Sequence, residues 1–240
     1  MKALAAQTRT ELVLTMRRGE SLLLIIGIPV LILVFFTTVD VLPKGSYPDA
    51  ISYLAPGVIA LAVMSTGMVQ LAIGTSFERQ YGVLKRLGTT PLGRPRLLTA
   101  KTLSIVAVEV VQVVVLVAIS LALGWDPSAQ GGTLAALILG TVAFSGLGLL
   151  MAGTLRGEVT LAAANGLYLV LLLLGGMVVP LSALPEGLRV VAELLPAAAL
   201  ADALAQSLTA GGVVPARDWI VLAVWAIAAP LAAAKLFRWE

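Results

Sequence analysis

The chain has 240 residues and a formal net charge of +3, with 59% hydrophobic and 12% charged residues. A water-soluble domain has about 45–50% apolar and about 25% charged residues. The apolar excess is too large for the core of one domain, so membrane lipid is the expected solvent for most of the chain. The sequence has no cysteine and no histidine, which excludes disulfides, the usual zinc and haem sites, and Ser-His or Cys-His nucleophiles. We expect an all-α membrane protein with no catalytic residue, no metal site and no nucleic-acid partner.

Residues 1–20 have the pattern of a helix that lies in the membrane interface. Apolar Leu4, Leu12 and Met16 fall on one helical stripe, and basic residues flank it. A solvated N-terminal segment is the alternative. The apolar run that follows is too long for the core of a secretory signal peptide.

Six apolar runs approach the roughly 20 residues that a helix needs to cross a hydrocarbon core. Pro29 lies inside the first run and predicts a kink there, which neighbouring helices can tolerate in a membrane. The predicted spans cover residues 22–42, 51–73, 102–123, 133–155, 160–179 and 219–237.

Residues 180–213 remain apolar, but prolines at positions 180, 185, 196 and 215 divide the segment into short pieces. The pieces 185–195 and 197–209 are both shorter than the roughly 20 residues of a spanning helix. We therefore expect a re-entrant pair of half-helices between the fifth and sixth spans, buried against protein.

The distribution of basic residues predicts the orientation. Of the 16 Lys and Arg residues, 13 fall on the side of the two termini and three on the other side. The positive-inside rule places the richer side in the cytoplasm. Both termini should therefore be cytoplasmic and the re-entrant pair should be extracellular.

The polar segment at residues 77–101, between the second and third spans, carries six of the 16 basic residues. Phe77, Tyr81, Leu84 and Leu87 follow helical spacing, and a Gly-Thr-Thr-Pro sequence at 88–91 should break that helix and begin a second short one. This pattern indicates a docking surface, although the charges could instead only set the orientation or bind anionic lipid. The candidate docking residues are Phe77, Glu78, Arg79, Tyr81, Gly82, Leu84, Lys85, Arg86, Leu87, Thr89, Thr90, Pro91 and Leu92.

Polar residues inside the spans are few. Glu109 and Gln112 lie about one turn apart in the third span, and a charge at that depth is costly enough to suggest a function. The alternatives for Glu109 are helix or subunit packing and contact with an ion or substrate.

A second polar set lies near the second and fifth spans. Gln70, Asn165 and Tyr168 could either bridge helices or line a substrate pathway. Met64, Met68 and Met177 could pack the core or supply adaptable walls to such a pathway.

The sequence Phe77-Glu78-Arg79-Gln80-Tyr81-Gly82-Val83-Leu84-Lys85-Arg86-Leu87-Gly88-Thr89-Thr90-Pro91-Leu92 resembles the FERE-x-G-T-L-K-R-L-x-x-T-P-L segment of ABC-2 type permeases. These are the membrane subunits of bacterial ABC exporters of the daunorubicin-type, multidrug-resistance branch. Residues 179–185 and the Leu195-Pro196 pair are similar to the family's outer loop. Gln80 and Tyr81 depart from the pattern, where an acid and a different residue are common.

The resemblance implies a half-transporter in the bacterial cytoplasmic membrane that pairs with a second permease copy, expected to be identical, and with separate ABC ATPase subunits. Residues 78–96 would correspond to the family's coupling region, and the substrate path would follow the dimer interface near the second and fifth spans. The chain has no Walker Gly-x-x-x-x-Gly-Lys-Ser/Thr sequence, so ATP and Mg²⁺ are expected on the partner and no cofactor on this chain.

The expected activity is ATP-driven efflux of hydrophobic or amphipathic compounds such as drugs, antibiotics or lipids. Two other transport functions stay open: export of a lipid-linked glycan by an ABC-2 permease, and an ion-coupled secondary carrier that uses Glu109.

Overall fold

The computed structural model describes residues 2–17, 19–39, 49–88 and 94–238, and all regular structure in these ranges is helical. The elements are α1 (Lys2–Arg17), α2 (Gly19–Thr38), α3 (Ala50–Met64), the π-helix η1 (Ser65–Gln70), α4 (Leu71–Gln80), α5 (Val83–Gly88), α6 (Arg94–Ala122), α7 (Gly132–Thr154), α8 (Gly157–Leu174), the 3-10 helix η2 (Leu181–Ala183), α9 (Glu186–Ala192), α10 (Pro196–Ser207) and α11 (Ala216–Leu236).

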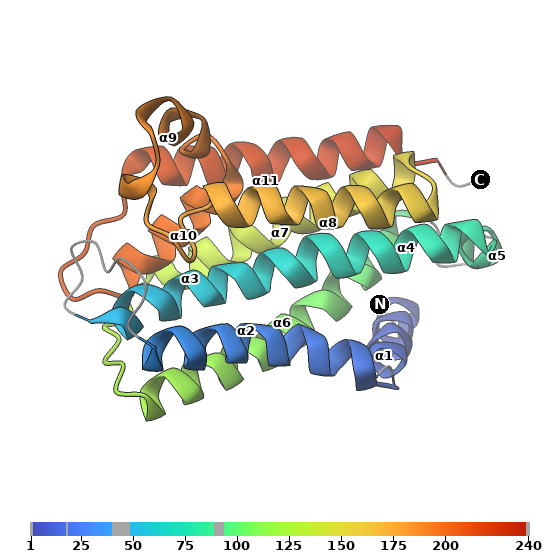
Figure 1. The fold of residues 1–240 in the computed structure, drawn as a ribbon. Helices are drawn as coiled ribbons and strands as arrows, with labels where there is room; N and C mark the ends of the chain where they lie inside the picture. The colour runs from blue at the N-terminus through green and yellow to red at the C-terminus, as the bar shows by residue number, and fades with distance from the viewer. Residues whose placement is uncertain (1, 18, 40–48, 89–93, 239–240) are drawn as a thin grey trace.

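The long helices lie side by side in one bundle, and α1 is set across one of its ends (Figure 1). Both α1 and the last turn of α11 lie at this end, which we call the α1 end; α9 marks the opposite end. Five helices of the described chain are long and apolar enough to cross a membrane. They are Ala50–Gln80, Arg96–Ala122, Gly132–Thr154, Gly157–Leu174 and Ala216–Leu236.

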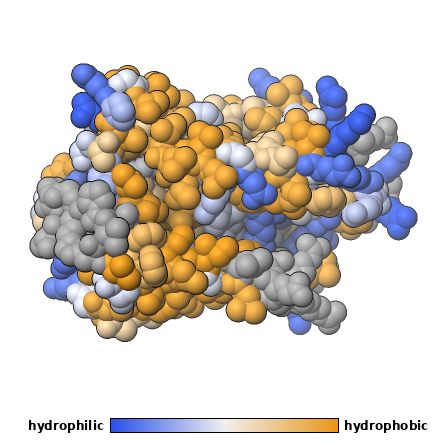
Figure 2. Space-filling model, viewed as in Figure 1, coloured by the Kyte–Doolittle hydropathy of each residue, from blue (hydrophilic) through white to orange (hydrophobic). Residues whose placement is uncertain are grey.

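The predicted first span falls on α2, in which the described apolar stretch Ile25–Thr38 is shorter than the other five. The prediction of a helical membrane protein is therefore confirmed. Five of the six predicted spans are therefore long enough, and a crossing by α2 stays a prediction. The last residues of its predicted range, 40–42, lie outside the described part of the chain. Figure 2 shows hydrophobic side chains over most of the visible face of the bundle and hydrophilic ones gathered near its ends.

The second span is longer than its predicted range of 51–73. α3, η1 and α4 form one continuous helix of 31 residues from Ala50 to Gln80. At about 1.5 Å per residue such a helix measures about 46 Å, against a hydrocarbon core of about 30 Å. Glu78 and Arg79 therefore continue the spanning helix, whereas the sequence predicted that they belong to a separate short helix after the span. The charged residues do not stop the helix, because Glu and Arg are good helix formers.

The fifth span is shorter than its predicted range of 160–179, because α8 ends at Leu174. Gly176 has a φ of +65°, a left-handed conformation that ends the helix. The hydroxyl of Tyr53 donates to the carbonyl of Gly176, and a Cβ on Gly57 would overlap the backbone of Met177. The chain therefore turns away from the helix axis where it touches α3.

Two short helices follow, in the region where the sequence predicted half-helices. α10 is buried on nearly all sides against α3, α7, α8 and α11, whereas most of α9 is exposed and projects from the bundle (Figure 1). The 12 residues of α10 measure about 18 Å, too short to cross the membrane. The two helices exist as expected, and their depth in the membrane stays a prediction.

α7 lies at the centre of the bundle because its glycines allow close packing. A Cβ on Gly146 would lie 2.6 Å from the backbone nitrogen of Pro230 in α11, and one on Gly148 would lie 2.8 Å from the carbonyl oxygen of Gly67 in η1. Small residues at helix contacts let backbones approach in this way.

Candidate functional site

A groove of about 580 Å³ opens on the side of the bundle where α4 runs between α2 and α8 (Figure 1). α2 packs on α3 and α6, whereas α8 packs on η1 and α4, so the two outer helices leave a space between them. The lining is mostly apolar. It consists of Ile25, Ile28 and Pro29 from α2, Ser65, Val69, Gln70, Ile73, Gly74, Phe77 and Glu78 from η1 and α4, Tyr81 and Val83 beyond α4, and Asn165 and Tyr168 from α8.

The groove brings together half of the predicted pathway residues. Gln70, Asn165 and Tyr168 all line it, from two helices far apart in sequence. Met64, Met68 and Met177 are fully buried in the core and do not line it. Since Met64 and Met68 are four residues apart, they share the core face of the second span, and the groove face belongs to their neighbours Ser65 and Val69.

Gln112 has partners on two other helices. Its Nε2 donates to the carbonyl oxygen of Ile25 at 2.9 Å, and its Oε1 accepts from the hydroxyl of Thr66 in η1 at 2.7 Å. Ile25 lies four residues before Pro29, which has no N–H to donate to that carbonyl. Gln112 therefore supplies the hydrogen bond that the proline removes from α2.

Glu109 lies one turn from Gln112 and is only 5% exposed. Its Oε2 accepts a hydrogen bond of 2.6 Å from Thr141 in α7. Its Oε1 has no hydrogen-bond partner among the described residues and faces Gly67 of η1, where a Cβ would lie 3.3 Å away. Neither Glu109 nor Gln112 lines the groove.

The predicted docking segment begins as a helix but does not continue as one. α4 ends at Gln80, and Gly82 has a φ of +72°, the left-handed conformation typical of the residue that follows a helix. The N–H of Tyr81 donates to Phe77 and that of Gly82 to Arg79, which closes the helix end. The single helix expected from Phe77 to Leu87 is therefore wrong, because a left-handed turn at Gly82 separates α4 from α5.

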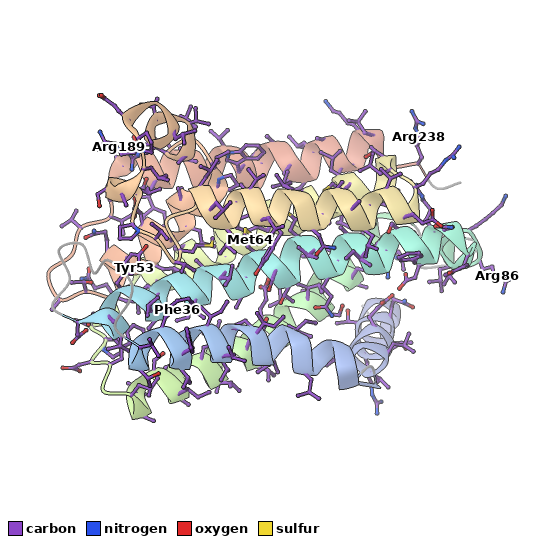
Figure 3. The ribbon with its side chains drawn as sticks, viewed as in Figure 1. Phe36, Tyr53, Met64, Arg86, Arg189 and Arg238 are labelled. Carbon is purple, nitrogen blue, oxygen red and sulfur yellow. The ribbon has the colours of Figure 1, made fainter. Side chains whose placement is uncertain are left out.

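α5 has one buried and one exposed side. Leu84 is fully buried beside Leu97 and Phe237, and Leu87 packs against the same cluster. Tyr81 is 70% exposed, and Lys85 and Arg86 are also exposed. Figure 3 shows Arg86 and Arg238 at the α1 end of the bundle and Arg189 at the opposite end. Thr89, Thr90, Pro91 and Leu92 lie outside the described residues.

Three predicted docking residues of α4 are held by other parts of this chain. The ring of Phe77 stacks on that of Tyr81, with centroids 6.1 Å apart, and Phe77 lines the groove. The guanidinium of Arg79 donates to the carbonyl of Leu155 at the end of α7 and to that of Arg238, the latter at 3.4 Å. Glu78 pairs with Lys101 of α6.

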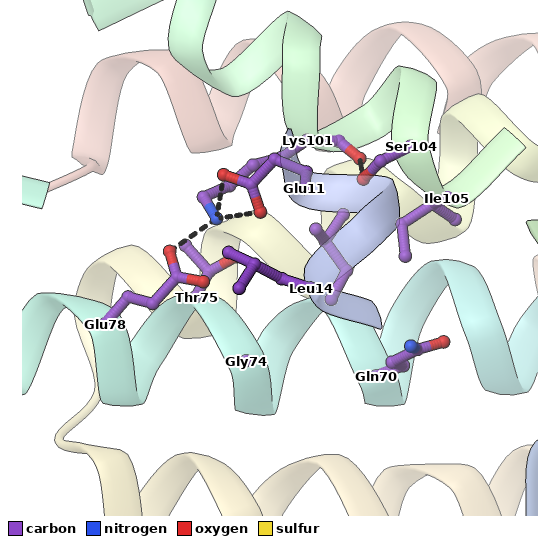
Figure 4. A pocket seen from close by; sticks show the side chains of 10 residues that line it. Glu11, Leu14, Gln70, Gly74, Thr75, Glu78, Lys101, Ser104 and Ile105 are labelled. Carbon is purple, nitrogen blue, oxygen red and sulfur yellow. Dashed lines mark hydrogen bonds and ion pairs between the residues drawn. The ribbon is translucent and has the colours of Figure 1, made fainter. Parts of the chain in front are cut away.

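Lys101 also pairs with a residue that the sequence did not single out. Its Nζ lies 3.1 Å from Oε1 and 3.2 Å from Oε2 of Glu11 in α1 (Figure 4). Lys101 therefore joins α1, α4 and α6. Glu11 and Lys101 are 90 residues apart, so no local pattern could reveal the pair.

A second ion cluster at the α9 end was also missed. Arg217, at the start of α11, lies 2.7 Å from Glu193 beside α9, 3.7 Å from Asp202 in α10 and 3.1 Å from Asp218. The available signal was compositional, since these charged residues stand in an otherwise apolar part of the sequence.

Comparison with known proteins gives the family. A comparison with curated proteins found no match. The family model described as ABC-2 type transporter matches residues 2–209, from α1 to the end of α10. Members of this family normally work with an ABC ATPase subunit, and their membrane domain carries no ATP-binding domain of its own. The chain belongs to the ABC-2 type transporter family and is a multi-pass membrane component of an ABC transporter.

Proposed function

We propose that this chain is the permease subunit of an ATP-driven exporter that moves hydrophobic or amphipathic compounds out of a bacterial cell. One observation carries the proposal: the substrate-sized groove ends on the segment that would receive the ATPase. Phe77, Tyr81 and Val83 line the groove and belong to the end of α4, the turn and α5. A partner that displaces this segment therefore changes the shape of the groove directly.

The composition of the groove supports the cargo class. Binding sites for small molecules have volumes of roughly 300–1,000 Å³ and mostly apolar walls with a few polar groups, and the groove of about 580 Å³ falls in this range. Gln70, Asn165 and Tyr168 supply uncharged hydrogen-bonding groups to its walls, and Glu78 is the one charged residue among the described residues that line it. Such walls suit an apolar body with one polar or cationic group, as in many drugs and lipids.

The exposed side of α5 and the turn before it is the proposed ATPase docking surface. It consists of Tyr81, Lys85 and Arg86, and we place the α1 end of the bundle with both termini in the cytoplasm. The matched sequence pattern and the excess of basic residues at this end support that orientation. In this arrangement α2 is the first of six spans, and α9 and α10 dip into the outer leaflet as part of an outer gate. ATP and Mg²⁺ bind only to the partner subunit.

A second copy of the chain is proposed to close the groove. α8 buries only Gly157, Thr160, Ala164 and Leu171, so most of its length is open to lipid or to a second copy. Its open face carries Ala162 and Gly166, spaced for close helix approach, beside the exposed amide of Asn165. An amide is poorly accommodated by lipid, and a homodimer would shield it while enclosing the two grooves.

Co-purification tests the partner. The double substitution Lys85→Glu and Arg86→Glu reverses two exposed charges of the docking surface, and Arg156→Glu reverses an exposed charge on the neighbouring turn as a control. We expect an ABC ATPase to co-purify with the wild type and the control but not with the double variant. Recovery of no ATPase, together with transport that persists without ATP, would make the ABC exporter proposal wrong.

Transport assays test the groove and the direction. Val69→Trp should fill the groove and abolish ATP-dependent movement of a hydrophobic cationic dye into inverted vesicles. Ile227→Trp, at an exposed position of α11 outside the groove, should not. If the dye moves only with an ion gradient and Glu109→Gln stops it, the secondary-carrier alternative holds. Selective movement of a lipid-linked glycan would favour the other alternative, a glycan-exporting ABC-2 permease.

A further inference from the structure

Three charged residues form a buried junction at the α1 end of the bundle, which we call the Glu11–Lys101–Glu78 junction (Figure 4). The side chain of Lys101 is 3% exposed, that of Glu11 11% and that of Glu78 22%. Ion pairs are screened far less at this burial than at the surface. A lysine this deeply buried almost always needs a partner, and here it has two.

Neighbouring residues contact the junction on several sides. Gln7 donates to Oε1 of Glu11 at 2.9 Å, one turn along α1. Ser104 donates to the backbone carbonyl of Lys101 at 2.8 Å. A small space of about 50 Å³ beside the ions is lined by residues of α1, α4 and α6, among them Leu14, Thr75 and Ile105. Figure 4 shows the side chain of Lys101 reaching both Glu11 and Glu78.

The junction connects α1 to the second span. Among the described residues, α1 packs along α6 and against α2 and comes close to α4 at few positions. Lys101 bridges that gap, since it binds Glu11 on α1 and Glu78 on α4. Glu78 lies two residues before the end of α4 and also lines the groove.

α1 is in turn followed by α2, which supplies the opposite wall of the groove through Ile25, Ile28 and Pro29. A displacement of the α4–α5 segment therefore has two routes to the groove. One is direct, through α4 itself. The other passes through Glu78, Lys101 and Glu11 to α1, and from α1 to the α2 wall.

We propose that Lys101 is a positioning residue that fastens the interfacial helix α1 to the end of α4, so that α1 and the α2 wall move with the docking segment. The inference rests on the proposed function, in which an ATPase moves that segment. It assigns α1 a part in transmission, and it assigns Glu11 and Glu78 an internal role in place of contact with the partner.

The absence of cysteine makes a distance measurement direct. Spin labels at Ala6→Cys in α1 and Val83→Cys in α5 report the fastened pair, and a label at Arg156→Cys before α8 gives an outside reference. In the complex with its ATPase, the Ala6–Val83 distance should stay constant between the nucleotide-free state and the ATP-bound state with hydrolysis blocked. The Ala6–Arg156 distance should change.

Glu11→Gln removes the negative charge of the α1 arm and one of its two carboxylate acceptors, and it keeps the shape of the side chain. We expect it to broaden the Ala6–Val83 distance distribution and to lower transport per ATP hydrolysed by about tenfold, within the usual range of coupling between sites. ATPase co-purification and ATP hydrolysis should stay near the wild-type level. Glu158→Gln, at an exposed acid of α8, is the matched control, and Lys101→Arg should retain most of the coupling because it keeps the charge.

Three outcomes would overturn the inference: α1 moving relative to α5 in the wild type, a Glu11→Gln variant that transports like the control, or an equal loss in Lys101→Arg and Glu11→Gln. The isolated permease separates this inference from the proposed function. Glu11→Gln must broaden the Ala6–Val83 distribution there too, with no ATPase present. A broadened distribution together with no ATPase in any pull-down would support the fastening and refute the exporter.

Discussion

Two ion clusters in the described part of the chain lie at opposite ends of the bundle and differ in burial. At the α1 end, Lys101 is 3% exposed between two carboxylates. At the α9 end, the side chain of Arg217 is 42% exposed, and those of its partners Glu193 and Asp202 are 29% and 40% exposed. Its third partner, Asp218, is buried at 1% exposed, so only the pairs of Arg217 with Glu193 and Asp202 are open to solvent on both sides. Exposed ion pairs contribute about 0–1 kcal/mol, whereas removal of one partner from a buried pair costs about 3–5 kcal/mol.

The difference suggests that the two ends have different mechanical roles. The buried cluster joins α1, α4 and α6, which agrees with the transmission of movement proposed for this end. At the α9 end, the pairs of Arg217 with Glu193 and Asp202 join α9, α10 and α11 through contacts that water and salt weaken, which agrees with the outer gate proposed above. At the α9 end, close backbone packing rather than charge provides the firm contact, at Gly57 and Met177.

The largest expected effect is at Lys101. Lys101→Met leaves two buried carboxylates without their cation and should lower the free energy of unfolding by about 3–5 kcal/mol. Lys235→Met, at an exposed position of the same end, should change it by less than about 0.5 kcal/mol. Denaturation with SDS in mixed micelles measures both. Equal effects of the two variants would mean that burial does not distinguish Lys101.

The next effect tests the backbone contact at the α9 end. Gly57→Ala should destabilise by about 1–3 kcal/mol, because its Cβ would overlap the backbone of Met177, which cannot give way as a side chain can. Gly27→Ala, where nothing lies within 4 Å, should stabilise the helix by about 0.5–1 kcal/mol. Opposite signs in the same unfolding assay are the expected result, and a neutral Gly57→Ala would contradict the close approach.

A smaller effect on stability is expected at Gln112, which lies away from both ion clusters. Gln112→Leu should cost about 1 kcal/mol, the usual scale of a hydrogen bond between membrane helices. In a Pro29→Ala background the carbonyl of Ile25 regains an N–H partner in its own helix, so the same change should cost less. A double-mutant cycle measures this difference, and additive effects would refute compensation of the proline by Gln112.

The smallest effect is expected at Glu193. Glu193→Gln should cost less than about 1 kcal/mol, because the pair is partly exposed and Arg217 keeps Asp218 at 3.1 Å. Added salt should weaken this contribution further, and it should affect Glu78→Gln much less. The free energy of unfolding of both variants, measured over a salt titration, makes the comparison. A larger loss of stability in Glu193→Gln than in Glu78→Gln would contradict the difference in burial between the two clusters.

Much of the fold follows from local pattern. The apolar runs predicted the long helices, and α7 and α11 begin and end close to the predicted residues, because length and hydropathy are properties of the segment itself. The errors lie where a turn depends on contacts elsewhere. Gly82 and Gly176 adopt left-handed conformations at the ends of α4 and α8, and nothing nearby in sequence distinguishes them from the other glycines.

The candidate site divides in the same way. The rarity of polar residues in lipid made Gln70, Asn165 and Tyr168 recognisable from sequence, and they meet in one groove. The sequence could not show whether Met64, Met68 and Met177 pack in the core or line the groove. That depends on which way each side chain points, and the packing of the helices decides it. Met64 points to the core, and its neighbour Ser65 points to the groove.

The sequence by itself determined that this is a helical membrane protein, which segments are apolar enough to span, and where a charged segment interrupts them. Hydrophobicity and charge act residue by residue, so they can be read without knowing which helices meet. Only the tertiary structure decided that Glu78 and Arg79 face inward, that Lys101 binds Glu11 across 90 positions, and that Gln112 replaces the hydrogen bond lost at Pro29. Each of these is a pairing between distant segments, and a pairing is fixed by packing geometry.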